Sequence, residues 1–499
     1  MKRNSGCLFQ ARYAVAAALI GIFVFCVRFS MLQKSAEPNG LDGYFYALQA
    51  KSLVQTGTLE NPSWNCGYYA CGISAFLTGD AVLGVKVWSA VSSALVALSV
   101  FLALIALTEH QTTALLGCLL CAASPSCAVM SIDYINNQTG LFFFLLYAAV
   151  LVRREKKKSR ARSAACAVLF LLSSLSHKIT LVYAFAFTAI YLLPKHLRQR
   201  PYFHAQKKQF RHTVALFVLA AGFLTAAVPF FTRQSPRFFH AFGWPSLPVF
   251  HKPAVATVGI WSATELSVYF VLIYAVSAVM LIKKGGKQKL LLFVPVLFFP
   301  FWNFDSDAGI RLFLSAVPAG IVVLLYFLHC AFGGQGVNGQ NPVFRRYARA
   351  VPCVVLLCAA WLSPRVYDPR KDPPFAYYRA VVSGIALDED SLLIAHLGLN
   401  HVYTYYCDLK DSLNYLPGFF VPDDKLWRLA YGANVWRMRS FFPEYAAAEI
   451  NALVQPIDGR YTLVREDIWQ QYLEREDEEI AETYRNWFNP YQVRPRFIR

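Results

Sequence analysis

Charged residues are scarce in this sequence, and acidic residues are scarcest in its first 363 positions. Only 16% of the 499 residues are charged, whereas 56% are apolar; in a soluble protein about a quarter are charged. The first 363 residues contain 10 acidic and 32 basic residues, and the last 136 contain 20 acidic and 16 basic. Because the basic part is also the apolar part, this balance excludes a soluble enzyme, a disordered chain and an ordinary nucleic-acid-binding protein.

Several motifs of well-known enzymes are also absent. There is no His-Glu-x-x-His, as in zinc proteases, and no Gly-x-Ser-x-Gly, as in serine hydrolases. The glycine-rich segment 333–339 lacks the Lys-Ser/Thr of a phosphate-binding loop, so we interpret it as a linker. Cysteines outside the apolar runs are few. Cys66 and Cys71 are compatible both with a disulfide and with two free thiols.

Long apolar runs are abundant. A membrane-spanning helix needs about 20 mostly apolar residues. We identify eleven candidates, at residues 13–31, 85–107, 113–130, 138–152, 163–176, 179–194, 213–231, 262–282, 290–302, 311–331 and 350–363. The fifth and sixth can also be interpreted as one long segment, and so can the ninth and tenth. Residues 1–363 are therefore expected to form an α-helical polytopic membrane domain with about 11 transmembrane helices.

The basic residues predict the orientation of these helices. They form five clusters, at residues 2–12, 153–162, 195–211, 283–289 and 345–349. All five fall on one side when eleven spans are threaded, and loops rich in Lys and Arg stay in the cytoplasm. We therefore expect a cytoplasmic N-terminus, a long external loop at 32–84 and an external C-terminal part. The first span is interpreted as an uncleaved anchor, because the residues after it make a poor cleavage site.

The external loop begins with a mixed apolar and aromatic stretch, residues 41–53, that is too short to span a membrane. A helix lying in the membrane interface fits it better. On such a helix Asp42, Tyr46 and Ala50 share one face. Eight of the ten acids of the membrane half are expected on this external side, and three of them are interpreted as solvated loop acids, namely Glu37, Glu60 and Glu265.

Residues 364–499 have an ordinary charge density and are numerous enough to bury a core of their own. Residues 391–397 and 461–464 predict strands, and 400–407 and 468–482 predict helices. We expect a small extracytoplasmic α/β domain.

The spacing of Asp42, Tyr46, Ala50 and Gly57 resembles a motif of the GT-C superfamily of membrane glycosyltransferases, which includes protein O-mannosyltransferases and lipid A aminoarabinose transferases. Similar features follow in the family's order, namely Gly79-Asp80, Ser124-Pro125, the polar stretch 131–138, Lys178, and Arg311 with Pro318. The resemblance covers about residues 40–330. Two features differ: Gly43 stands in place of the family's second acid, and residues 65–69 replace its Pro-Pro-Leu.

The resemblance implies an enzyme of the cell (inner) membrane that uses a polyprenyl-phosphate sugar as donor. The lipid tail of the donor stays in the bilayer, and the sugar passes to an acceptor (a protein, lipid or glycan) at the external face. Such a transfer needs a carboxylate to take the acceptor's proton, an anion near the oxocarbenium-like transition state, and cations that face the departing phosphate.

The two carboxylates that we assign to catalysis are Asp42, as the base, and Asp133, as a second carboxylate. Asp133 could also be a ligand of Mg²⁺ or Mn²⁺, although the sequence has no metal signature. Ordinary alternatives stay open: Asp42 as a helix N-cap and Asp133 as a solvated turn residue.

We expect Tyr46, His177, Lys178 and Arg311 to bind the substrate, the last three at its phosphate. The ordinary alternatives are a lysine that reaches the lipid headgroups, an interfacial histidine, and an ion pair of Arg311 with Asp305 or Asp307. At the level of the whole protein, two other functions stay open. A transporter or flippase of lipid-linked sugars would commonly show repeats and helices broken at the midplane, and a non-catalytic scaffold would agree with Gly43.

Overall fold

The computed structural model describes residues 3–61, 63–198, 265, 272, 306–332, 366–388, 391–395, 398–407, 409–410, 412–414, 435–439, 454–456 and 462–465. The expected spans 213–231, 262–282, 290–302 and 350–363 lie outside these residues, apart from Glu265 and Leu272. The expected helix 468–482 also lies outside them.

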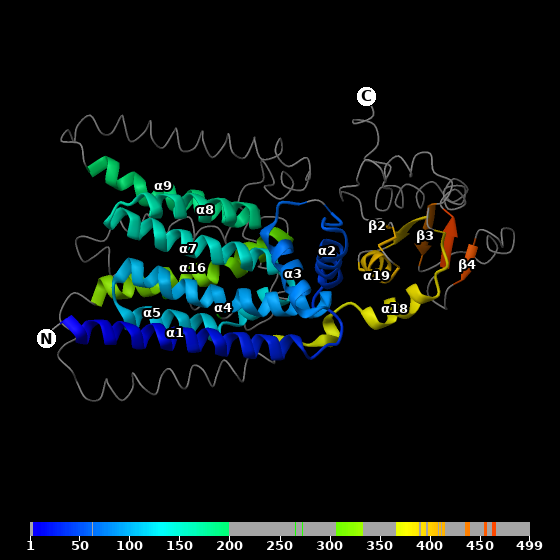
Figure 1. The fold of residues 1–499 in the computed structure, drawn as a ribbon, viewed down its shortest axis with the longest axis horizontal. Coiled ribbons are helices and arrows are strands. Elements are labelled where there is room, and N and C mark those ends of the chain that lie inside the picture. Colours follow the sequence, from blue (N-terminus) through cyan, green and yellow to red (C-terminus); the bar gives the residue numbers. More distant parts are fainter. Residues whose placement is uncertain are drawn as a thin grey trace, which may run out of the picture.

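Most of the described chain is a bundle of long helices that run side by side (Figure 1). They are α1 (Arg3–Leu32), α4 (Ala81–Thr108), α5 (Gln111–Ala123), α6 (Pro125–Asp133), α7 (Ile135–Lys156), α8 (Arg160–Ser176), α9 (Lys178–Arg198) and α16 (Ser306–Phe332). Among the described residues, Ala11–Leu32, Ala81–Thr108 and Ile135–Lys156 are long and apolar enough to cross a membrane. The broken pair α5/α6 would make a fourth span if counted as one.

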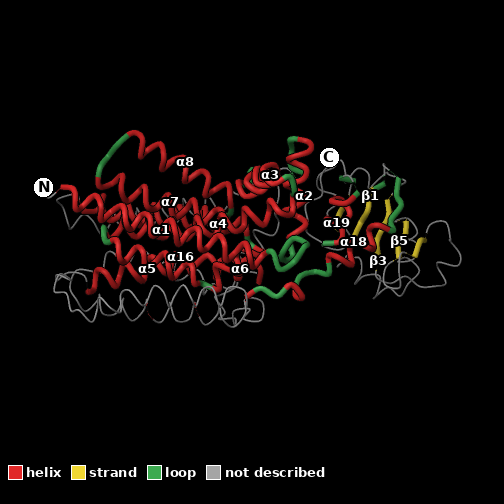
Figure 2. Tube along the Cα trace, turned by 60° about the horizontal axis from the view of Figure 1, so that its bottom comes forward, coloured by secondary structure: helices red, strands yellow, loops and turns green. Residues whose placement is uncertain are grey.

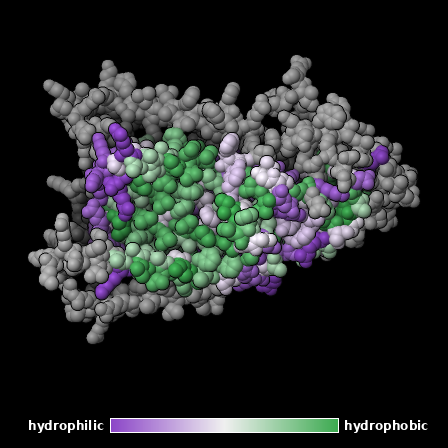
Figure 3. Space-filling view, viewed as in Figure 1, coloured by the Kyte–Doolittle hydropathy of each residue, from purple (hydrophilic) through white to green (hydrophobic). Residues whose placement is uncertain are grey.

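The surface of the bundle agrees with a membrane location. An apolar belt covers its middle, and polar residues lie at its two ends (Figure 3). One end carries the basic residues that close α7 and open α8, and we call it the basic end. The opposite end carries the loop between α1 and α4, and we call it the loop end.

The expected span 113–130 is interrupted in the structure, because the chain bends by 56° between α5 and α6. Pro125 is the first residue of α6 and has no N–H for the preceding turn. A proline also disfavours helical backbone in the residue before it, and Ser124 is extended (φ −65°, ψ 120°). The Ser124 hydroxyl then accepts from the Cys127 N–H, which starts the new helix.

The segments 163–176 and 179–194 are two helices rather than one long segment. α8 and α9 form an antiparallel hairpin in which the rings of Phe170 and Phe185 lie 5.0 Å apart. The chain turns at His177, whose backbone is extended. The Thr180 hydroxyl closes the turn by donating to the Ser173 carbonyl at 2.8 Å.

The loop between α1 and α4 contains two helices, α2 (Gly43–Thr56) and α3 (Cys66–Thr78). The first confirms the helix expected at 41–53. α3 lies directly against α4, and a Cβ at Gly84 would collide with the backbone of Ala75. Cys66 and Cys71 are both free thiols, and Cys71 is buried.

Beyond the loop end lies a mixed sheet (Figure 2). Its described strands are β1 (Leu392–Ala395), β2 (Ser412–Asn414), β3 (Val435–Arg439), β4 (Val454–Pro456) and β5 (Thr462–Arg465), in the order β2-β1-β3-β5-β4. β1 is parallel to β2 and β3, whereas β5 is antiparallel to β3 and β4. The short helices η2 (Pro369–Lys371), α18 (Phe375–Ser383) and α19 (Leu399–Tyr406) accompany it. The expected strands at 391–397 and 461–464 and the expected helix at 400–407 are confirmed.

The loop end and the sheet share one hydrophobic core. Tyr44 and Ala47 of α2 belong to the same buried cluster as Phe375, Leu393 and Val402. α2 therefore lies between the helical bundle and the sheet, with α18 and α19 on its far side (Figure 1).

Candidate functional site

Asp42 immediately precedes α2 and is half-buried. It occupies the N-cap position, yet its side chain makes no capping hydrogen bond (φ −92°, ψ 12°). The ordinary interpretation of Asp42 as a helix cap is therefore wrong. Its negative charge acts instead on two tyrosines of the same loop, Tyr46 and Tyr68.

These tyrosines belong to an aromatic cluster. Phe45, Tyr46 and Tyr68 lie with ring centroids 5.6–6.1 Å apart, and His401 of α19 lies 5.1 Å from Phe45. Burial raises the pKa of Tyr46 and of Tyr68, and Asp42 raises both further, while Arg311 acts in the opposite direction. Both hydroxyls therefore stay protonated at neutral pH and can donate hydrogen bonds. Tyr68 was not among the residues expected from the sequence.

Asp133 ends α6, and its carboxylate accepts the N–H of Leu41 at 2.9 Å. It is therefore not a solvated turn residue. The contact requires a glycine at position 40: Gly40 has φ +76°, and a Cβ there would collide with Asp133 Oδ1. The structure thus brings Asp133 next to the residue that precedes Asp42, although 90 positions separate the two acids in the sequence.

Asp133 was also predicted from the sequence as a candidate ligand of Mg²⁺ or Mn²⁺. Among the described residues, no group of three or more His, Cys, Asp or Glu side chains is arranged to hold a metal ion. The divalent cation stays a prediction.

Arg311 lies near the start of α16. Its Nη1 donates to Asn137 Oδ1 at 3.4 Å, and its guanidinium carbon lies 5.0 Å from the centroid of the Tyr134 ring. Its positive charge reaches Tyr46, Tyr68, Asp133, His177 and Lys178. Asp305 lies outside the described residues, so the ion pair expected there stays untested.

His177 and Lys178 form the turn between α8 and α9. The Ile179 N–H donates to His177 Nδ1 at 3.2 Å, so a neutral imidazole carries its proton on Nε2. Burial, followed by the positive charges of Arg311 and Lys178, lowers the pKa of His177 well below its ordinary value. His177 is therefore neutral at pH 7 and can donate from Nε2. Lys178 is exposed.

The loop is also tied to this turn by Asn65. Its Nδ2 donates to the Ser176 carbonyl at 2.7 Å, and its Oδ1 accepts from the Gly67 N–H at 2.8 Å. Asn65 thus caps α3 and holds it against α8. The segment that replaces the family's Pro-Pro-Leu therefore has a structural role here.

All six residues expected from the sequence come together at the loop end. They are Asp42, Tyr46, Asp133, His177, Lys178 and Arg311. Tyr68, Tyr134 and Asn137, which contact members of this group, were not predicted from the sequence. The last two belong to the polar stretch 131–138, which was noted only as a family feature.

Two acids expected as solvated loop residues are in fact bound. Glu37 accepts from the Tyr44 hydroxyl and forms an ion pair with Arg379 at 2.9 Å. Glu265 accepts from the Ser124 hydroxyl at 3.0 Å and from the Ser126 N–H at 3.1 Å. The third, Glu60, is half-buried. Glu265 faces the α5/α6 break, where the interrupted helix leaves backbone groups that need partners.

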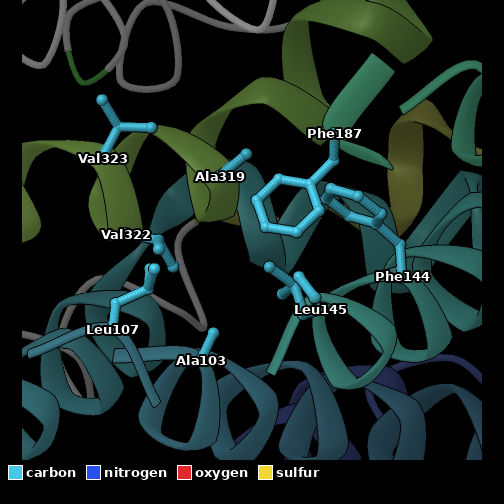
Figure 4. Close-up of a pocket in the computed structure, with 9 residues that line it drawn as sticks. Ala103, Leu107, Phe144, Leu145, Phe187, Ala319, Val322 and Val323 are labelled. Atoms are coloured by element: carbon cyan, nitrogen blue, oxygen red, sulfur yellow. The ribbon is translucent and has the colours of Figure 1, made fainter. Parts of the chain in front are cut away.

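A cavity elsewhere in the bundle has a different character (Figure 4). It lies among α4, α7, α9 and α16, and the residues that line it are Ala103, Leu107, Phe144, Leu145, Ala148, Phe187, Ala319, Val322 and Val323. All nine are apolar, so this cavity has no group for acid–base chemistry. In the described part of the chain, the carboxylates and cations that acid–base chemistry needs are instead found together at the loop end.

No family model matches this sequence, and no curated protein matches it. Solved structures do match it, among them two of ArnT, and they show that the fold is similar over most of the chain. The apo crystal structure of ArnT from Cupriavidus metallidurans matches with 14% identity and a TM-score of 0.51, over 92% of this chain and 98% of that one. The crystal structure of the same ArnT bound to undecaprenyl phosphate matches with 14% identity and a TM-score of 0.54, over 91% and 97%.

Proposed function

We propose that this protein is a glycosyltransferase that moves a sugar from a polyprenyl-phosphate donor to an acceptor at the loop end of the membrane domain. The observation that carries the proposal is the convergence there of two carboxylates, Asp42 and Asp133, with the cationic residues Arg311 and Lys178. The structural likeness to an ArnT bound to undecaprenyl phosphate supports a polyprenyl-phosphate partner.

The phosphate of the donor would face Arg311, Lys178 and the Nε2–H of His177. Arginine and lysine stabilise the charge that a departing phosphate gains, and a neutral histidine adds a hydrogen bond. The hydroxyls of Tyr46 and Tyr68 can donate to oxygens of the sugar. The lipid tail would extend from the site into the bilayer around the apolar belt.

In the transfer step, the acceptor oxygen forms a bond to the anomeric carbon as the bond from that carbon to the phosphate oxygen breaks. The phosphate leaves with the electron pair. The acceptor's proton passes to the Asp42 carboxylate, and the negative charge of the site stabilises the oxocarbenium-like transition state.

The basic clusters support an external site. The basic end is expected in the cytoplasm, so the loop end and the sheet would lie outside. A lipid-linked donor that has crossed the membrane would present its sugar there.

Transport of a lipid-linked sugar is the second candidate, because the α5/α6 pair is a broken helix of the kind found in transporters.

The third candidate is a scaffold, a protein that keeps the fold without catalysing a reaction. Gly43 favours this only weakly: a Cβ at Gly43 would lie 3.0 Å from Pro38 atoms, so local packing already accounts for the lost acid.

The deciding experiment compares wild type with Asp42→Asn in membranes at matched expression. A panel of polyprenyl-phosphate sugars is supplied, and release of free polyprenyl phosphate is followed. We expect Asp42→Asn to lower turnover by about 10²–10⁴-fold and to keep donor binding, because a general base contributes that much. Glu109→Gln, an exposed acid at the basic end, is the matched control and should behave as wild type.

The three functions predict different results. A transporter would move donor across the membrane without releasing polyprenyl phosphate. A scaffold would neither release nor move the lipid, and would tolerate Asp42→Asn. No release from folded wild-type protein across the whole panel would contradict the proposed transferase.

A further inference from the structure

The backbone just before Asp42 is held by two carboxylates from distant parts of the chain. The Leu41 N–H donates to Asp133 at 2.9 Å, and the Gly40 N–H donates to Asp372 Oδ1 at 3.1 Å. Asp133 comes from the helical bundle, whereas Asp372 comes from the segment that leads from the bundle to the sheet. Two consecutive amides are thus fixed immediately before the proposed base.

We infer that Asp372 is a positioning residue: together with Asp133 it fixes the turn 39–42 and so sets where the Asp42 carboxylate lies. The inference rests on the proposed function. It goes further in assigning the C-terminal segment a part in the reaction through the loop that it holds.

Asp372 is itself fixed by a short chain of hydrogen bonds. The Tyr367 hydroxyl donates to Asp372 Oδ2. Asn39 Nδ2 donates to the Tyr367 oxygen at 2.6 Å and to the Leu32 carbonyl at 3.0 Å. Tyr367 and Asn39 are both buried. The chain of contacts therefore runs from the end of α1 to the turn, and Asp372 cannot shift without breaking it.

The arrangement also has an electrostatic cost. Asp372 lies close enough to Asp133 for their charges to repel, and Asp133 is close to Asp42 as well. Burial raises the pKa of Asp372, and the ammonium of Lys86 opposes that shift. Apolar residues would fill this place without gathering like charges. What the two carboxylates supply, and apolar residues would not, is a fixed direction for two backbone N–H groups.

The test uses the full-length protein in liposomes and compares Asp372→Ala and Asp372→Asn with a neighbouring acid, Asp368→Asn. Asp368 pairs with the exposed Arg370 at 3.0 Å, and its negative charge acts on Asp372. Asp368→Asn therefore removes a nearby charge but keeps both carboxylate acceptors of the turn. Two quantities are measured: kcat and donor KM for release of polyprenyl phosphate, and hydrogen–deuterium exchange of peptides that cover residues 39–43.

For Asp372→Ala we expect kcat to fall by about 10–100-fold, because a small misplacement of a catalytic group costs that much, while donor KM stays as in wild type. Exchange at residues 39–43 should become at least about tenfold faster, since Gly40 loses its acceptor. Asp372→Asn keeps an oxygen for Gly40 and should lie between wild type and the alanine variant. Asp368→Asn should match wild type in both measurements.

Wild-type exchange in Asp372→Ala would overturn the inference, and so would wild-type kcat or an equal loss in Asp368→Asn. If Asp372→Ala does not fold, Tyr367→Phe and Asp372→Asn decide, because each loosens the same contacts without removing the side chain's bulk. If wild type releases nothing from any donor, the proposed function fails, and the exchange measurement alone still decides whether Asp372 fixes the turn.

Discussion

At the scale of single residues, Arg311 connects the parts of the candidate site. Its charge reaches side chains of α2, α3, α6 and the α8–α9 turn, and its guanidinium is held by Asn137 and Tyr134. A planar guanidinium can bind two phosphate oxygens at once, which an ammonium cannot do in the same geometry. Arg311 is therefore the residue on which donor binding should depend most strongly.

Replacing Arg311 should weaken donor binding, and alanine should weaken it more than lysine. We expect Arg311→Ala to raise donor KM by about 10–100-fold, since a hydrogen bond to a charged group is worth about 1.5–3 kcal/mol. Arg311→Lys should recover part of this loss. The measurement is donor KM in liposomes, with direct binding of free polyprenyl phosphate as a second readout. Arg370→Ala removes an exposed arginine and serves as control; unchanged KM and binding in Arg311→Ala would place the phosphate elsewhere.

At the scale of elements, the break between α5 and α6 determines where the site forms. α6 directs the chain to Asp133, and the break exposes polar backbone inside an apolar bundle. Arg28 of α1 is buried and donates to the Ala122 and Ser124 carbonyls, both at 3.1 Å. Glu265 satisfies the start of α6 and lies within electrostatic range of Arg28. Arg28 thus hydrogen-bonds to backbone carbonyls at the end of α5, and Glu265 accepts a backbone N–H at the start of α6.

Removing one of these charges should destabilise the protein. Arg28→Met removes a donor from both carbonyls. Ser124 keeps its bond from the Ala128 N–H, whereas Ala122 loses its described donor, and a buried unsatisfied group costs about 1–3 kcal/mol. The substitution also leaves Glu265 buried without its nearby positive charge, and the double variant Arg28→Met/Glu265→Gln should recover part of the loss. Thermal unfolding of the detergent-solubilised protein checks this, with Arg12→Gln on the exposed face of α1 as the matched control. A wild-type melting temperature in Arg28→Met would show that the break is stabilised by other contacts.

At the scale of the whole molecule, the basic end and the loop end should lie on opposite sides of the membrane. We expect a cysteine at Asp388, near the sheet, to react with a membrane-impermeant thiol reagent in intact cells. A cysteine at Lys157, in the basic turn after α7, should react only after permeabilisation. Both positions are exposed. The protein with its native cysteines sets the background, and the reverse labelling pattern would place the candidate site in the cytoplasm.

The sequence by itself determined the local features of this protein. Apolar runs predicted α1, α4 and α16, and a mixed apolar and aromatic stretch predicted α2. A family-like spacing predicted a role for Asp42 and Tyr46, and a family-like order of later features predicted one for Arg311. These signals are readable because helix formation and membrane insertion depend on residues that are neighbours in the chain.

The tertiary structure decided how the distant residues are used. From the sequence, Glu37 and Glu265 were interpreted as solvated acids, whereas in the folded chain they contact Arg379 and Ser126. The apolar run 113–130 forms two helices that meet at a 56° bend. Asp133 and Asp372 meet Leu41 and Gly40 across about 90 and 330 positions of sequence. No local pattern encodes such contacts: a carboxylate in water and a carboxylate that holds a backbone amide have the same letter in the sequence, and only the packing of the folded chain distinguishes them.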